Sequence, residues 1–127
     1  MVKDDMAKIL VVDDSEHQRF QLKKDLESGG YIVVEGVDAN DGLEKLWQNS
    51  DVALVICDVN MPGMDGVTMC SKIHESGKFP GLPVFMLTSE ASAELKKIAK
   101  QFGVRAWITK PYNGAKLLEA VEKVIKK

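Results

Sequence analysis

The chain has 127 residues, a length that suits one domain around a single hydrophobic core. Hydrophobic residues make up 45% and charged residues 28%, as in globular proteins, and the net charge of −2 argues against general binding to nucleic acid phosphates. No apolar run approaches the ~20 residues that cross a bilayer, and the polar start is unlike a signal peptide. We therefore expect one cytoplasmic domain over residues 1–127, with a core at about 8–126 and a polar extension at 1–6.

The apolar residues predict an alternation of strands and helices. Five short apolar runs predict buried strands at 9–12, 31–34, 52–57, 84–87 and 104–108. Segments with helical apolar spacing follow each run, beginning near residues 15, 39, 65, 91 and 113. Alternating strands and amphipathic helices are typical of a parallel sheet covered on both faces. Right-handed crossovers then limit the topology to a few doubly wound arrangements.

The two cysteines, Cys57 and Cys70, lack the spacing of metal ligands, and each lies in an apolar pattern. We interpret both as reduced thiols of the core, in agreement with a cytoplasmic location.

Polar side chains follow four of the predicted strands. Asp13 and Asp14 follow the first strand, Asp58 the third, Thr88 the fourth and Lys110 the fifth. Each alone has an ordinary explanation as a helix cap, a buried acid or a solvated lysine. Parallel strands, however, bring all five to the carboxyl edge of the sheet, where open α/β folds bind ligands. Their convergence favours a functional site.

Three neighbouring carboxylates require positive charge between them. Two unit charges 4 Å apart interact by roughly 4 kcal/mol at an effective dielectric constant of 20. Lys110 supplies one cation, and Mg²⁺, with Mn²⁺ as a substitute, is the natural second. Mg²⁺ keeps phosphate oxygens in its shell, so this set suggests phosphoryl transfer with Asp58 as the nucleophile and Thr88 as a hydroxyl donor.

Four motifs carry a resemblance to a known family. They are residues 11–15 (VVDDS), 58–66 (DVNMPGMDG), 87–89 (LTS) and 109–111 (TKP). Together they resemble the receiver domain of two-component response regulators, in particular the stand-alone, chemotaxis-type regulators, from about Lys8 to the C-terminus. The resemblance implies a doubly wound (βα)5 flavodoxin-like domain with a five-stranded parallel sheet in the order 2-1-3-4-5.

The resemblance also implies roles for single residues. Asp58 matches the phosphoacceptor, and Asp13 and Asp14 match the acidic pair that holds Mg²⁺ together with Asp58. Thr88 matches a switch hydroxyl that turns toward the phosphoryl group, and Lys110 matches the lysine that pairs with that group.

Four further positions match the family less simply. Asn60 matches a metal ligand through its backbone carbonyl, Pro111 a proline after a cis peptide bond, and Glu90 a position that tunes the phosphoryl lifetime. Trp107 occupies the position of an aromatic switch residue, where Tyr or Phe is usual. Two interpretations stay open for it: a working switch, or an indole packed against the last two helices.

The resulting hypothesis is a regulator that is switched by phosphorylation and has no separate substrate. A sensor histidine kinase or a histidine phosphotransfer protein would be the donor. No DNA-binding segment follows the last helix, so we expect output to a protein partner through the fourth helix, fifth strand and fifth helix, where Lys96, Lys97, Lys100 and Lys116 lie.

Two alternatives were weighed against this hypothesis. A Mg²⁺-dependent phosphatase with an aspartyl nucleophile needs an Asp-x-Asp arrangement after the first strand, whereas Asp13 and Asp14 are adjacent. A flavin-binding domain of similar topology needs a phosphate loop rich in hydroxyl groups and glycine there, and acids would repel the phosphate.

Overall fold

The computed structural model describes residues 6–89 and 93–125, in which strands and helices alternate. The elements, in chain order, are β1 (Lys8–Val12), α1 (Glu16–Ser28), β2 (Ile32–Gly36), α2 (Ala39–Gln48), β3 (Val52–Asp58), α3 (Gly66–Ser76), β4 (Val84–Thr88), α4 (Ala93–Lys100), β5 (Val104–Thr109) and α5 (Gly114–Ile125).

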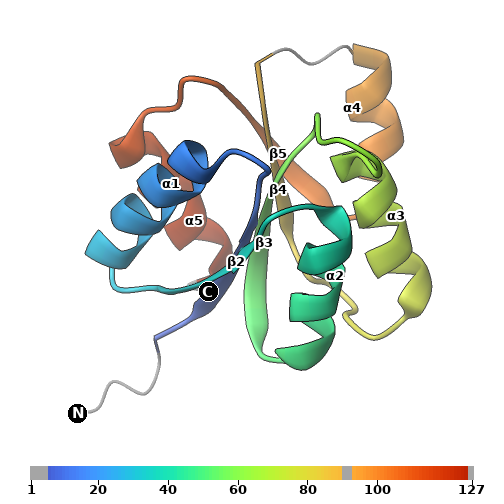
Figure 1. Ribbon diagram of the computed structural model, residues 1–127, viewed down its shortest axis with the longest axis horizontal. Helices are drawn as coiled ribbons and strands as arrows, with labels where there is room; N and C mark the ends of the chain where they lie inside the picture. The colour runs from blue at the N-terminus through green and yellow to red at the C-terminus, as the bar shows by residue number, and fades with distance from the viewer. Residues whose placement is uncertain (1–5, 90–92, 126–127) are drawn as a thin grey trace.

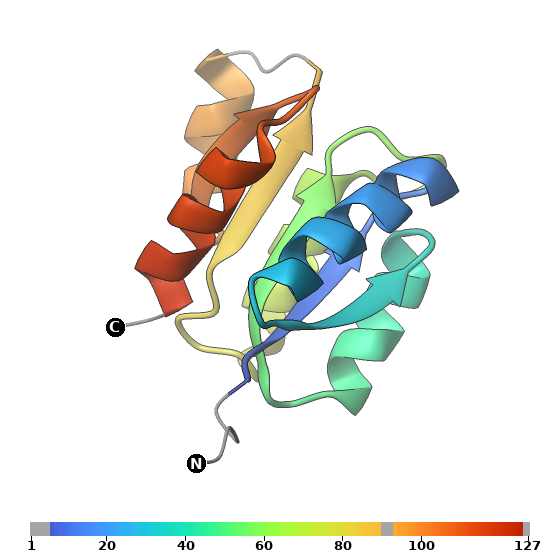
Figure 2. The same cartoon turned by 90° about the vertical axis from the view of Figure 1, so that its left-hand side faces the viewer.

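The five strands form one parallel sheet in the order β2-β1-β3-β4-β5. Helices α1 and α5 cover one face of this sheet, and α2, α3 and α4 cover the other (Figure 1). The view in Figure 2 places α1 and α5 in front of the strands. The predicted fold class and strand order are therefore confirmed. None of the described helices is both long and apolar enough to cross a membrane.

Two hydrophobic clusters fill the spaces between the sheet and its two helical layers. The cluster under α1 and α5 includes Ile9, Leu22 and Phe85, and the cluster under α2, α3 and α4 includes Leu10 and Met86. Alternate residues of β1 enter opposite clusters because successive side chains of a strand point to opposite faces. A sheet buried on both faces explains why its central strands are almost continuously apolar.

The helix starts follow the capping pattern in the sequence. Ser15 accepts a hydrogen bond from Gln18 N at 3.2 Å, and Asp65 accepts one from Thr68 N at 2.8 Å, so each satisfies a free N–H of the first turn. Two apolar side chains with helical spacing are less buried than the pattern suggested. Trp47 on α2 is 41% exposed, and Ile98 on α4 is 43% exposed.

Gly66 begins α3 at a point where the helix packs directly against the end of β3. A Cβ atom at this position would overlap the Asp58 carbonyl oxygen and lie 3.1 Å from Cys57 Sγ. The backbone N–H of Gly66 donates to the Val59 carbonyl oxygen at 2.9 Å. The missing side chain therefore allows α3 to begin beside the strand end that carries Asp58.

Substitution Gly66→Ala should lower the free energy of unfolding by about 1–3 kcal/mol, because the added methyl group must displace backbone. Urea denaturation measures this loss. Thr68→Ala, an exposed change in the same first turn, is the matched control and should stay within about 0.5 kcal/mol of the parent. Equal stability of the two variants would show that α3 can shift away from β3 at little cost.

Candidate functional site

Asp58 lies at the carboxyl end of the central strand β3. Its Cα is paired with Leu87 of β4, and the preceding Cys57 is paired with Val12 of β1. Asp58 is only 5% exposed. The parallel register therefore holds a nearly buried carboxylate between the ends of β1 and β4.

Asp13 and Asp14 follow β1 directly and lie beside Asp58. One carboxylate oxygen from each of the three residues lies within 4.8 Å of the other two. Asp13 is 1% exposed, and its Oδ1 accepts a hydrogen bond from Ser15 N at 2.9 Å. Within the described residues, Asp13 Oδ2 is buried and accepts no hydrogen bond. A buried carboxylate oxygen without a donor is costly, so this atom is suited to a cation.

Lys110 provides a cation from the end of β5. Its Nζ lies 3.2 Å from Asp58 Oδ1, with which it forms a hydrogen bond, and 3.5 Å from Asp13 Oδ2. Its backbone N–H donates to the Thr88 carbonyl oxygen at 2.8 Å, which fixes the start of the loop after β5 to the end of β4. The peptide bond between Lys110 and Pro111 is cis. The lysine is thus anchored at its backbone and directed at two carboxylates.

The pKa of Asp58 is raised, first by burial and then by the negative charge of Asp13. Lys110 opposes the shift through its charge and its hydrogen bond, and the backbone N–H of Asn60 opposes it through a further hydrogen bond. Lys110 therefore offsets only part of the cost of burying the Asp58 carboxylate beside Asp13. The remaining unfavourable energy favours binding of another cation.

The donor set fits Mg²⁺. This ion binds hard oxygen ligands at about 2.0–2.1 Å in an octahedron and takes one or two carboxylates from the protein. One carboxylate oxygen from each of Asp13, Asp14 and Asp58 is close enough to the other two for all three to share one ion. The exposure of Asp14 also leaves one side of the site open to solvent.

The remaining predicted residues occupy different surroundings. Thr88 is buried at the end of β4, and Asn60 is exposed in the loop after β3. Trp107 is half-buried on β5, paired with Met86, and contacts the cluster under α2, α3 and α4. Its indole therefore lies on the α4 side of the sheet. Glu90 lies outside the described residues.

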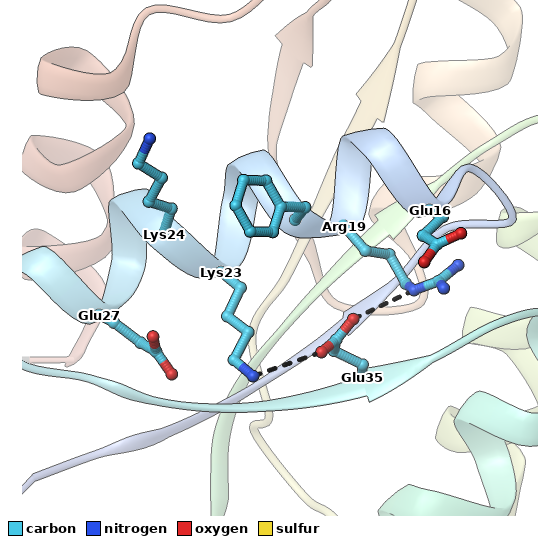
Figure 3. Close-up of a pocket in the computed structure, with 7 residues that line it drawn as sticks. Glu16, Arg19, Lys23, Lys24, Glu27 and Glu35 are labelled. Atoms are coloured by element: carbon cyan, nitrogen blue, oxygen red, sulfur yellow. Dashed lines mark hydrogen bonds and ion pairs between the residues drawn. The ribbon is translucent and has the colours of Figure 1, made fainter.

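Arg19 is a site residue that the sequence did not reveal. Its Nη1 donates to the Asp13 carbonyl oxygen at 2.8 Å, and its Nε pairs with Glu35 Oε1 at 3.2 Å. Figure 3 shows Arg19 and Lys23 of α1 both reaching Glu35 of β2 beside a hollow of about 390 Å³. The guanidinium thus ties the acidic turn after β1 to α1 and β2. No motif marks it, because the contact depends on how α1 packs on the sheet.

The sequence matches the response regulator receiver domain over residues 9–122. The chain belongs to this family.

Two curated relatives and one solved structure illustrate the similarity of this receiver domain to known proteins. It is 35% identical over 119 residues to chemotaxis protein CheY1 of Helicobacter pylori, covering 93% of this chain and 96% of that protein. It is 32% identical over 119 residues to the sensor histidine kinase CheAY of H. pylori, covering 93% of this chain but 15% of that protein. The CheX–CheY complex with BeF3 and Mg²⁺ from Borrelia burgdorferi contains a chain that is 30% identical, with a TM-score of 0.87, covering 95% of this chain and 90% of that one.

The family is one of two-component signalling switches, and the comparisons give the phosphatase alternative no support. The receiver-domain resemblance seen in the sequence is therefore confirmed, including its likeness to chemotaxis regulators.

The raised pKa of Asp58 predicts how the stability of the metal-free receiver domain depends on pH. Because the pKa of Asp58 in the folded protein lies above its unfolded value of about 4, the folded protein binds the proton of the Asp58 carboxyl group more tightly than the unfolded chain does. Stability therefore falls as pH rises from the unfolded pKa to the folded pKa. Asp58→Asn removes this loss. In chelator, the variant should gain free energy of unfolding over the parent between about pH 3 and about pH 7 in urea denaturation.

The control is Asp41→Asn, because the pKa of Asp41 is lowered, chiefly by the hydrogen bond from Val37 N. Its carboxylate stabilises the fold above the unfolded pKa, so this variant should lose stability relative to the parent over the same range. If both variants changed stability relative to the parent in the same direction over this pH range, the opposite pKa shifts of Asp58 and Asp41 would be contradicted.

Proposed function

We propose that Asp58 accepts a phosphoryl group from a phosphohistidine of a sensor histidine kinase or histidine phosphotransfer protein, in a Mg²⁺-dependent reaction. The observation that carries this proposal is the placement of Lys110 Nζ 3.2 Å from Asp58 and 3.5 Å from Asp13, beside a third carboxylate. This combination of a nucleophilic oxygen and fixed positive charge is what phosphoryl transfer requires.

The reaction forms one bond and breaks one. A carboxylate oxygen of Asp58 attacks phosphorus, the P–N bond to the donor imidazole breaks, and an acyl phosphate remains on Asp58. The imidazole nitrogen keeps the bonding electron pair. Lys110 Nζ hydrogen-bonds Asp58 Oδ1, which leaves Oδ2 as the better placed nucleophile and puts the ammonium group near the incoming phosphoryl oxygens.

Asp13, Asp14, Asp58 and the backbone carbonyl of Asn60 would hold Mg²⁺. When bound, the ion would neutralise phosphoryl oxygens during transfer. Asp13 contributes through its buried Oδ2, which no hydrogen bond satisfies within the described part of the chain. Asp14, being exposed, contributes at the solvent side of the site. The similar CheY chain in a complex solved with BeF3 and Mg²⁺ supports the choice of metal.

Phosphorylation would shift a conformational equilibrium at the ends of β4 and β5. Thr88 and Thr109 are paired across these strands, and Lys110 N–H binds the Thr88 carbonyl oxygen. A phosphoryl group that draws the Thr88 hydroxyl and Lys110 inward therefore acts on both strands at once. Trp107, two residues before Thr109, would report or transmit that change as a population shift.

The output surface is proposed to consist of α4, β5 and α5, in a cytoplasmic chemotaxis-type pathway. Lys96, Lys97 and Lys100 of α4 and Lys116 of α5 are exposed. A hollow of about 410 Å³ beside β5 and α5 is lined in part by Trp107 and Lys116. A protein partner that contacts this hollow would contact β5 beside Trp107. The similarity to CheY1 supports the choice of pathway.

The acceptor role predicts a mass change. Incubation with acetyl phosphate and Mg²⁺ should add one phosphoryl group in intact-mass spectrometry, and chelator should suppress the addition by at least about tenfold, because phosphoryl charge is then uncompensated. Asp58→Asn should show no addition because its amide is a poor nucleophile. An equal adduct in that variant would move the acceptor to another residue and overturn the proposal.

Lys110→Ala tests the coupling between the site and β5. In a Trp47→Phe background, Trp107 is the one tryptophan left, and its fluorescence should change on addition of Mg²⁺ and acetyl phosphate. The Lys110→Ala variant should keep a response to Mg²⁺ but lose most of the response to the donor, since the ammonium no longer follows the phosphoryl group.

Lys100→Ala, an exposed change on α4, is the matched control and should preserve both responses. A full donor response in the Lys110→Ala variant would assign the conformational change to other residues. Intact mass in the same samples separates loss of coupling from loss of phosphorylation.

A further inference from the structure

A second concave surface lies at the end of the sheet opposite the acidic cluster. We call it the lower groove. It consists of a hollow of about 400 Å³ between the end of α3, the loop at 77–83 and the turn at 101–103, and an adjoining hollow of about 310 Å³ that shares Phe79–Leu82. Both segments precede strands, β4 and β5, whereas Asp58 ends one, so the two surfaces occupy opposite edges of the parallel sheet (Figure 1).

The charges of the lower groove all have one sign. Among the described residues that line its two hollows, none is acidic, and the charged or titratable ones are Lys78, His74 and Arg105. The whole chain has 19 acidic and 17 basic residues, so the positive charge of this groove is local and opposite in sign to the net charge of the chain. Within the described part of the chain, none of these three side chains forms an ion pair with a carboxylate.

Aromatic rings form the walls of the lower groove. Phe79 stacks on Trp47, with ring centroids 5.8 Å apart and an interplanar angle of 17°. Lys78 Nζ lies 5.3 Å from the centroid of the Trp47 ring, and His74 packs edge-on against Phe102 at 5.6 Å. These contacts explain why Trp47 remains 41% exposed: its ring packs on a loop at the rim instead of in the core.

The backbone of the lower groove has a fixed shape. Gly77, Gly81 and Gly103 have φ values of 69°, 77° and 89°, which other residues rarely adopt. Pro80 and Pro83 restrict the same loop, and Leu82 N–H donates to the Phe79 carbonyl oxygen at 3.2 Å. A surface that is already shaped loses little entropy when a ligand binds, so it is suited to recognition.

We propose that the lower groove docks an acidic peptide segment of a partner protein, with one large apolar side chain inserted between Phe79 and Phe102. Cations at the rim and apolar walls between them match a segment that carries carboxylates on either side of an apolar anchor. The volume of the groove is at the lower end of the range for ligand sites, about 300–1,000 Å³, which suits one such anchor.

A protein segment fits the lower groove better than nucleic acid does. Affinity for nucleic acid grows with the number of phosphates that Lys and Arg neutralise, and this groove offers two such side chains besides His74. The walls also contain apolar surface from Phe79 and Leu82, which the polar backbone of a nucleic acid would leave uncovered. The groove shares no residue with the acidic cluster, so docking there can be measured without phosphorylation of Asp58.

The test is a titration of the ¹⁵N-labelled protein, without Mg²⁺ or phosphoryl donor, with a short peptide of aspartate and glutamate around one central phenylalanine. Saturable amide shifts should centre on the loop at 77–83 and the turn at 101–103. Arg105→Glu and Lys78→Glu should each weaken binding by at least about tenfold, whereas Lys96→Glu on α4, the matched charge reversal, should change it by less than about twofold.

Three probes define the outcomes that would overturn the proposal. A peptide with serine in place of phenylalanine, a peptide with lysine in place of the acids, and an oligothymidylate should all bind at least about tenfold more weakly than the acidic peptide. Equal or tighter binding of any of them, shifts centred elsewhere, or no saturable binding of the acidic peptide would each refute an acidic docking segment. Acetyl phosphate labelling of Arg105→Glu at the rate of the parent verifies that the variant is folded.

Discussion

The contact of one ammonium group with two carboxylates is the interaction on which the site depends. Lys110 Nζ reaches both Asp58 and Asp13, yet the pKa of Asp58 remains raised by burial and by Asp13. Folding therefore leaves the site short of positive charge: among the described residues, Asp13 Oδ2 is buried and accepts no hydrogen bond, and Lys110 Nζ lies 3.5 Å from it. A site in this condition favours binding of a further cation, and a metal ion bound there would also compensate the negative charge of a phosphoryl group.

The parallel sheet makes this arrangement possible. Every crossover returns the chain to the same edge, so the ends of β1, β3, β4 and β5 deliver their polar residues side by side. Close packing behind that edge restricts the positions of the strand ends. Gly66 lets α3 pack against the Asp58 carbonyl group, and Arg19 hydrogen-bonds the turn after β1. Small displacements of β4 or β5 must then change the position of Lys110, which is bonded to both Thr88 and Asp58.

Much of this could be predicted from the sequence, because it depends on local patterns. Apolar runs located the strands, Ser15 and Asp65 indicated helix starts, and the polar residues at strand ends marked the site. The environments of Arg19 and Trp47 could not be predicted. Arg19 reaches a backbone carbonyl only because α1 packs over β1 and β2, and Trp47 has helical spacing typical of the core yet stacks on Phe79, 32 residues along the chain. Such contacts depend on tertiary packing and leave no periodic signal.

The two ends of the sheet differ in a way that bears on how a small switch could act. At the carboxyl edge, the three carboxylates of Asp13, Asp14 and Asp58 outnumber the one lysine, Lys110, that pairs with them. At the opposite edge, the lower groove is cationic and fixed in shape by glycines at positive φ and by prolines. An activated surface must change with phosphorylation, whereas a docking surface is most useful when it does not. If the lower groove docks a partner as proposed, the length of the strands would separate that docking surface from the acidic cluster.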